Sequence, residues 1–162
     1  MSILLIRTDD RFIHGQVTTG WARQMGIDHI ALVNDGIAKN SIIMKLQQAS
    51  AGQNILVEFF SIEQAIASIK KGEFCTRGKY FLLIENPVDL LELVKAGLTV
   101  NEVNLGNLHF EPGRKKVTNW VFASPGHLEA LKELDSMGVK LTAQWVVASD
   151  AVDVNHWLKK NT

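Results

Sequence analysis

Short runs of hydrophobic residues alternate along the chain with longer stretches in which hydrophobic residues recur at helical spacing. The short runs are continuous rather than alternating, which is typical of strands covered on both faces of a parallel sheet. They predict strands at residues 3–7, 28–34, 55–60, 80–85, 100–105 and 139–147, with a short edge strand at 116–122. The longer stretches predict helices at residues 15–25, 37–50, 62–71, 87–96, 124–137 and 151–159.

This strand–helix alternation predicts an α/β fold, a mainly parallel open β-sheet flanked by helices on both faces. The chain has 162 residues and no linker, repeat or low-complexity tract, so we expect a single domain over residues 1–162. In open α/β sheets, ligands bind beyond the carboxyl ends of the strands. The loop after the first strand is the richest in reactive side chains, and we expect the active site there.

The composition narrows the class of partner. Lys plus Arg and Asp plus Glu each total 17, and this balance argues against nucleic acid as a partner. The single cysteine, Cys75, excludes an intramolecular disulfide and fits a reducing compartment. The first residues turn charged too soon for a signal peptide, and no apolar run approaches the ~20 residues of a membrane span. A role at a membrane would therefore need a partner that docks the protein there.

The loop that follows the first predicted strand contains the stretch RTDDRFIHGQV, residues 7–17. His14 precedes Gly15 and the predicted start of the first helix. A helix N-terminus presents unpaired N–H groups and a partial positive charge, which suit an anion such as phosphate. Arg11 could bind the same anion through its forked guanidinium. The pattern therefore predicts a phosphate site at this loop.

A histidine in such a place could be a ligand, a general acid or base, or a nucleophile that carries a covalent phosphoryl group. Asp9 or Asp10 could orient its other ring nitrogen or hold Arg11 in place. Side chains of these types also make turn and cap hydrogen bonds, so the residues alone leave a structural loop open.

The stretch closely resembles the phosphorylation-site signature of the IIB subunit of mannose-family sugar phosphotransferase systems, R-x-D-[DNE]-R-[LF]-[IV]-H-G-Q-V. Further segments resemble the family in the same order and spacing: LVNDGIAKN (32–40), NPVDLLELVKAGLTVNEVNLGNLHF (86–110), GRKKVT (113–118) and LKELDSMGVKL (131–141). The resemblance covers nearly the whole chain and implies a largely parallel sheet flanked by helices.

The resemblance also implies a function. A IIB subunit accepts a phosphoryl group from a phosphohistidine on the IIA subunit, carries it on its own histidine, and passes it to a sugar held by the membrane subunits IIC and IID. This is the reaction of a protein-N(π)-phosphohistidine–sugar phosphotransferase, performed in the cytoplasm at the inner face of the membrane. No metal or organic cofactor is implied, and a homodimer is left open.

The family roles fall on residues of the first loop. His14 is the implied phosphoryl acceptor, and Arg11 corresponds to the family arginine near the phosphoryl group. Asp9 and Asp10 are expected to support catalysis, and Gly15 and Gln16 are expected to contact the phosphate together with Arg11. The motif does not decide which ring nitrogen of His14 carries the group.

Residues of other loops are expected at the rim of the site: Asp35, Asn107 and His109, although loop polar groups also simply satisfy the backbone. The stretch NLGNLHFEPGR (104–114) is similar to the N-acetylgalactosamine and galactosamine branch of the family. The resemblance therefore implies a hexose or a hexosamine as the sugar.

Other functions fit the residues less well. A response-regulator receiver would share the acidic pair Asp9–Asp10 but would need an aspartate at the end of the third strand, which ends in FFS. A nucleotide-binding enzyme would need a glycine-rich first loop, and neither common form is present. The remaining alternative is a non-catalytic or regulatory module that binds sugar phosphates through His14 and Arg11 without covalent chemistry.

Overall fold

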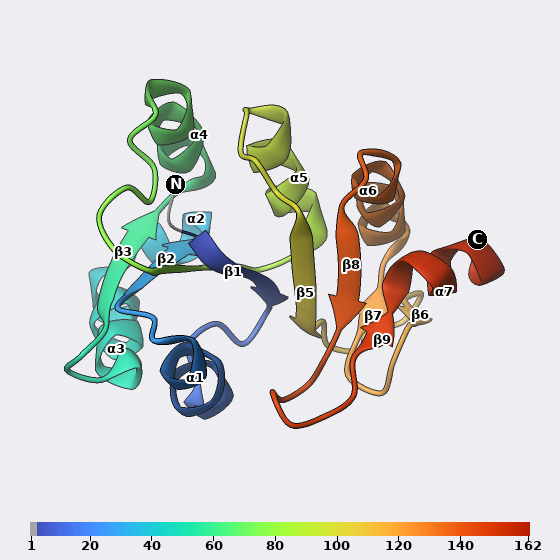
Figure 1. Cartoon of the computed structure of the whole chain (residues 1–162), viewed down its shortest axis with the longest axis horizontal. Helices are drawn as coiled ribbons and strands as arrows, with labels where there is room; N and C mark the ends of the chain where they lie inside the picture. Colours follow the sequence, from blue (N-terminus) through green and yellow to red (C-terminus); the bar gives the residue numbers. More distant parts are fainter. Residues whose placement is uncertain (1–2) are drawn as a thin grey trace.

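The computed structural model describes residues 3–162 and contains a seven-stranded sheet in the order β3-β2-β4-β1-β5-β8-β9 (Figure 1). Its strands are β1 (Ile3–Asp9), β2 (His29–Val33), β3 (Leu56–Phe60), β4 (Tyr80–Ile84), β5 (Glu102–Asn107), β8 (Lys140–Ala143) and β9 (Val152–Asp153). All neighbouring strands pair in parallel except β8 and β9, which are antiparallel. The predicted α/β fold with a mainly parallel sheet is confirmed.

Helices cover both faces of the sheet, as predicted, and each face has its own hydrophobic cluster. One cluster joins the sheet to α4 (Ile62–Lys71), α5 (Pro87–Lys95), α6 (Pro125–Ser136) and α7 (Val154–Asn161). The other joins the opposite face to η1 (Gln16–Ala22), α2 (Asp35–Ala38) and α3 (Ser41–Ala51), and the short α1 (Arg23–Met25) continues η1. The two layers hold the strands between them, which explains the continuous apolar runs.

The strand order determines where a site can open. β1 lies between β4 and β5, and the chain leaves it toward β2 through η1 on one face. The chain leaves β4 toward β5 through α5 on the opposite face. The loops after β1 and β4 therefore diverge at the carboxyl edge of the sheet, where α/β folds bind ligands.

Several predicted elements differ from the structure. The predicted last helix at 151–159 begins only at Val154, because Val152 and Asp153 pair with β8 as β9. The predicted helix at residues 37–50 is divided into α2 and α3, because the Asn40 side chain accepts hydrogen bonds from the Ile42 and Ile43 N–H groups and starts a new helix. The predicted edge strand at 116–122 is wrong, since β6 (Lys115–Lys116) and β7 (Phe122–Ala123) form a separate two-stranded sheet.

The predicted last strand at residues 139–147 is too long. β8 ends at Ala143, and the apolar residues that follow lie in a loop that leads to β9. Sequence periodicity counts these residues as strand because they are hydrophobic, but the Gln144 side chain donates to the carbonyls of Val147 and Ser149 and folds the segment back on itself. This loop contributes to the site described below.

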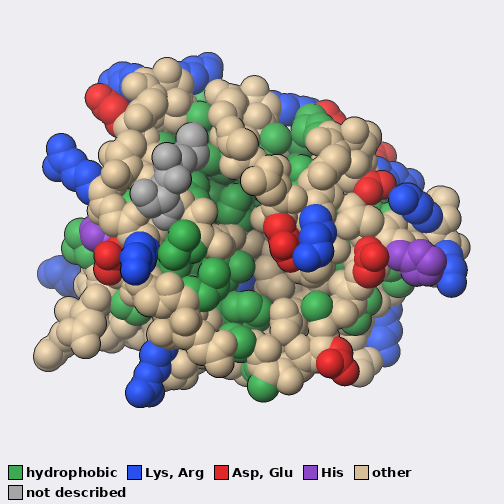
Figure 2. All heavy atoms as spheres, viewed as in Figure 1, with side chains coloured by type: hydrophobic (Ala, Val, Ile, Leu, Met, Phe, Trp, Pro, Cys, Tyr) green, Lys and Arg blue, Asp and Glu red, His purple; other side chains and the backbone are tan. Residues whose placement is uncertain are grey.

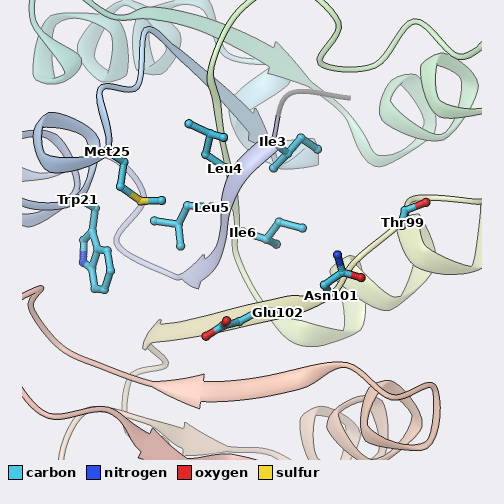
Figure 3. A pocket seen from close by; sticks show the side chains of 9 residues that line it. All are labelled: Ile3, Leu4, Leu5, Ile6, Trp21, Met25, Thr99, Asn101 and Glu102. Carbon is cyan, nitrogen blue, oxygen red and sulfur yellow. The ribbon is translucent and has the colours of Figure 1, made fainter.

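A cavity of about 650 Å³ lies at the amino ends of β1 and β5, lined by the first residues of β1 and by Trp21, Met25 and Glu102 (Figure 3). Hydrophobic side chains gather on this face of the molecule (Figure 2), and Leu4 is 46% exposed. The cavity lies at the opposite edge of the sheet from the loop that follows β1. No helix within residues 3–162 is long and apolar enough to cross a membrane.

Candidate functional site

The centre of the site is the carboxylate of Asp9, the last residue of β1, which is fully buried. Its Oδ2 atom lies 3.1 Å from His14 Nε2. Arg11 Nε lies 3.1 Å from Oδ1, and Arg11 Nη2 lies 3.1 Å from Oδ2. From the strand itself, Arg7 Nη2 lies 3.2 Å from Oδ2. One carboxylate therefore joins both arginines of the motif to its histidine.

A tight turn brings His14 back to this carboxylate. The Phe12 N–H donates to the Asp9 carbonyl at 3.0 Å, and Phe12 has a φ of 58°, a value that residues with a Cβ rarely adopt. Ile13 is buried, and its N–H donates to Gln47 Oε1 of α3 at 2.9 Å. The buried Ile13 side chain and the hydrogen bond to Gln47 of α3 therefore both fix the turn.

The helix that follows His14 begins one residue later than predicted and is a π-helix over η1. π-Helical segments are rare and occur frequently at functional sites. The Val17 and Thr18 N–H groups donate to the His14 carbonyl. Gly15 and Gln16 lie at the start of the helix, where a backbone N–H group has no acceptor within the helix itself. The Gln16 side chain accepts from Arg11 Nη1 at 3.1 Å, which adds a second anchor for the guanidinium.

Arg7 is fully buried and connects the site to distant strands. Its Nη1 donates to Asn104 Oδ1 and, at 2.9 Å, to the Gln144 carbonyl, and its Nη2 donates to the Trp145 carbonyl at 3.1 Å. A Cβ on Gly106 would lie 2.2 Å from Arg7 Cζ, so only glycine leaves room for the guanidinium. Burial lowers the pKa of Arg7 to about 10, which still leaves it charged at neutral pH.

Burial by itself would raise the pKa of the Asp9 carboxyl. Hydrogen bonds from His14 and Arg11 and the charges of Arg7 and Arg11 outweigh burial, and together they lower the pKa of Asp9 below its ordinary value. At neutral pH Asp9 is therefore an anion that can only accept hydrogen bonds.

An aromatic ring supports Arg11 from one side. The Arg11 guanidinium carbon lies 4.3 Å from the centroid of the Trp145 ring, within the range of a cation–π interaction. Trp145 belongs to the loop after β8, and its ring also lies 5.7 Å from that of Trp120. The Arg11 side chain is 31% exposed, so the guanidinium is fixed but still open to solvent.

Asp10, expected beside the histidine, instead binds the loop after β5. It accepts from Asn107 Nδ2 at 2.6 Å and from the His109 N–H at 2.7 Å, and its carboxylate also contacts His109 Nδ1. The other ring nitrogen of His109 lies 2.8 Å from Glu111 Oε1. Hydrogen bonds with Asp10 and Glu111 raise the pKa of His109. Asn107 and His109 therefore reach the motif through Asp10 and not through His14.

Asp35 also has a structural contact. Its Oδ1 accepts from the Ile62 N–H at 2.9 Å, which joins α2 to the start of α4. Asp35 lines a hollow together with Phe12 and Glu85, beside the turn of the β1 loop. Within residues 3–162, no group of three or more histidine, cysteine or acidic side chains is arranged to hold a metal ion.

Comparison with known protein families identifies the family to which this chain belongs. The family model described as PTS system sorbose subfamily IIB component, where PTS denotes the phosphotransferase system, matches residues 3–162. The chain belongs to this family. It is a IIB component of a sugar phosphotransferase system, and the resemblance found in the β1 motif is confirmed.

The relatives of this IIB component are named for more than one sugar. It is 36% identical to the sorbose-specific EIIB component of Klebsiella pneumoniae, over 93% of this chain and 90% of that protein. It is 32% identical to the N-acetylgalactosamine-specific phosphotransferase enzyme IIB component 2 of Escherichia coli, over 94% of this chain and 96% of that protein. The crystal structure of the IIBSor domain of the sorbose permease from Klebsiella pneumoniae superposes with a TM-score of 0.88 at 31% identity, covering 100% of this chain and 99% of that one.

Four residues of the IIB site were not predicted from the sequence: Arg7, Asn104, Gly106 and Trp145. Only Arg7 leaves a signal, because a charged residue inside an apolar strand must find a buried partner. The others lie about a hundred residues or more along the chain from the motif, and only the pairing of β1 with β5 and of β5 with β8 brings them to it.

Proposed function

We propose that His14 is the residue on which this IIB component carries its phosphoryl group. The group would come from a phosphohistidine of the IIA subunit and pass to a sugar held by IIC and IID. The observation that supports this is the pairing of His14 Nε2 with Asp9 Oδ2 at 3.1 Å, on the carboxylate that also binds Arg11. A nucleophile, an orienting carboxylate and a cation for the phosphoryl group thus meet at one point.

The same pairing favours one ring nitrogen. An ionised Asp9 only accepts hydrogen bonds, so His14 Nε2 must carry the proton. The lone pair of the neutral ring is then on Nδ1, and we propose Nδ1 as the nucleophile. A bond forms from Nδ1 to phosphorus while the bond to the donor nitrogen breaks, and the donor imidazole leaves with that electron pair.

Arg11 and the start of η1 supply what phosphoryl transfer needs, namely position and charge neutralisation. We propose that Arg11 and the N–H groups of Gly15 and Gln16 bind the phosphoryl oxygens. A carrier must also release its phosphoryl group, and one arginine with a few N–H groups suits this better than a metal ion would. Asp9 positions His14, while Asp10 positions the loop that begins at Asn107.

We propose a hexose or a hexosamine as the sugar, since relatives named for sorbose and for N-acetylgalactosamine match at similar identity. N-Acetylgalactosamine remains our specific candidate, on the stretch at residues 104–114. The enzyme class is that of a protein-N(π)-phosphohistidine–sugar phosphotransferase. We further propose that residues 1–162 form a single IIB domain, which acts in the cytoplasm against the membrane subunits.

The test is phosphoryl loading. The protein is incubated with labelled phosphoenolpyruvate, the two general phosphotransfer proteins and a mannose-family IIA. We expect a label that is acid-labile and alkali-stable, with coupling between phosphorus and Nδ1 in the NMR spectrum of ¹⁵N-histidine-labelled protein. An unlabelled chain beside fully loaded IIA would contradict the proposal and favour a non-catalytic module that binds sugar phosphates. Coupling to Nε2 would contradict only the choice of nitrogen.

Arg11→Ala is expected to slow phosphoryl loading by about 100-fold to 1,000-fold, because a charged donor to the transferring group is lost. The fold should persist, since Asp9 keeps Arg7 and His14 as partners. Rapid-quench rates and thermal unfolding measure the two effects. Arg23→Ala, on the exposed surface of α1, is the matched control. Unchanged loading in Arg11→Ala would remove Arg11 from the site.

A further inference from the structure

Arg11 must keep one orientation to serve the proposed chemistry. All three of its guanidinium nitrogens are engaged, two with Asp9 and one with Gln16, each at 3.1 Å. These bonds use three of the five guanidinium N–H groups, which leaves one on Nη1 and one on Nη2 for a phosphoryl group on His14. These two N–H groups can bind the phosphoryl oxygens only while the guanidinium keeps its orientation.

A further contact of the Arg11 guanidinium is with the Trp145 ring, whose centroid lies 4.3 Å from the guanidinium carbon. A cation–π contact attracts the charge to the face of the ring and does not require an N–H hydrogen bond. The ring can thus hold the cation and leave its N–H groups available to the phosphoryl oxygens. Without the ring, Asp9 and Gln16 alone would orient the guanidinium.

The chain at Trp145 is also held by contacts other than Arg11. The backbone of Trp145 is fixed by Arg7, which donates to the carbonyls of Gln144 and Trp145. The Gln144 N–H donates to the Leu105 carbonyl at 3.0 Å, which continues the pairing of β8 with β5. The backbone that carries the Trp145 ring is therefore held independently of Arg11.

We propose that Trp145 is a positioning residue that holds the Arg11 guanidinium in the orientation that binds the phosphoryl group on His14. This inference rests on the proposed function, because it concerns the same transfer. Trp145 would act on the rate of transfer and not on the binding of IIA. It would act only through Arg11.

The test compares four variants in single-turnover loading from purified phospho-IIA: Trp145→Leu, Trp145→Phe, Arg11→Ala and Arg11→Ala with Trp145→Leu. Trp145→Leu is expected to lower the rate at saturating phospho-IIA by about threefold to tenfold, with the half-saturating concentration within about twofold of wild type. Trp145→Phe keeps an aromatic face and should lose less. In the Arg11→Ala background, Trp145→Leu should have no further effect.

Trp157→Leu is the matched control, since Trp157 lies on α7 with its indole 5.6 Å from Lys115 and its replacement should leave the rate unchanged. An unchanged rate in Trp145→Leu, or an equal loss with and without Arg11, would overturn the role of Trp145 while wild-type loading upholds the proposed function. Failure of the wild type itself to load from phospho-IIA would overturn both.

Discussion

His14→Ala is expected to abolish phosphoryl loading, to below about a thousandth of the wild-type rate, because no neighbouring side chain can replace the nucleophile. The variant should still fold. Among residues 3–162, the side-chain partner of the His14 ring is Asp9, and Asp9 keeps both of its arginines when the ring is removed. Label retained on the filter or gel after incubation with phospho-IIA measures the effect.

His156→Ala is the matched control for this experiment. His156 is exposed on α7, and its backbone N–H, rather than its ring, meets the capping Asp153 side chain. We expect wild-type loading in this variant. Wild-type labelling of His14→Ala would show that the phosphoryl group resides on another residue, and the site proposed at the β1 loop would then be wrong.

The second large effect concerns stability. Asp9→Asn is expected to lower the free energy of unfolding by about 3–5 kcal/mol, because it leaves the fully buried charge of Arg7 without an anion. Urea denaturation followed by circular dichroism measures the loss. Asp10→Asn is the comparison: Asp10 partners the largely exposed His109, so its loss should be smaller. Equal losses in the two variants would contradict the central place of Asp9.

The same carboxylate predicts a pH dependence. The pKa of Asp9 is lower in the folded protein than in the unfolded chain, where it is about 3.9. Its contribution to stability is therefore complete above that unfolded value and is lost as the pH falls below it through the folded pKa. The stability difference between wild type and Asp9→Asn should shrink on acidification below about pH 4. A constant difference would assign the stabilisation to packing instead of charge.

The fold was largely predictable from hydrophobic periodicity, because parallel strands covered on both faces leave continuous apolar runs. The errors fall where a polar side chain overrides the hydrophobic pattern. Asn40 caps a new helix inside an unbroken apolar stretch, and Gln144 turns an apolar run into a loop. Both side chains act through hydrogen bonds to backbone groups that periodicity does not register.

The site was predictable only as far as the motif reaches. Asp9, Arg11 and His14 are close in sequence, so a single turn can bring them together. The different contacts of the neighbouring carboxylates Asp9 and Asp10 were not predictable, because they depend on the direction in which each side chain points at the end of β1. Asp9 ends the strand pointing inward, and Asp10 leaves it to meet the β5 loop. The role of Trp145 could not be predicted, because its approach to Arg11 depends on the order of strands in the sheet.

The anchoring of Arg7 has a consequence for the order of events during synthesis. Arg7 leaves the ribosome well before its hydrogen-bond partners at Gln144 and Trp145, which are 137 and 138 residues later. A nascent chain that stops before β8 contains the complete histidine motif and lacks the carbonyls that accept hydrogen bonds from Arg7. The Arg7 contacts beside the motif are therefore among the last to form, so a half-made chain does not hold the motif in its final geometry.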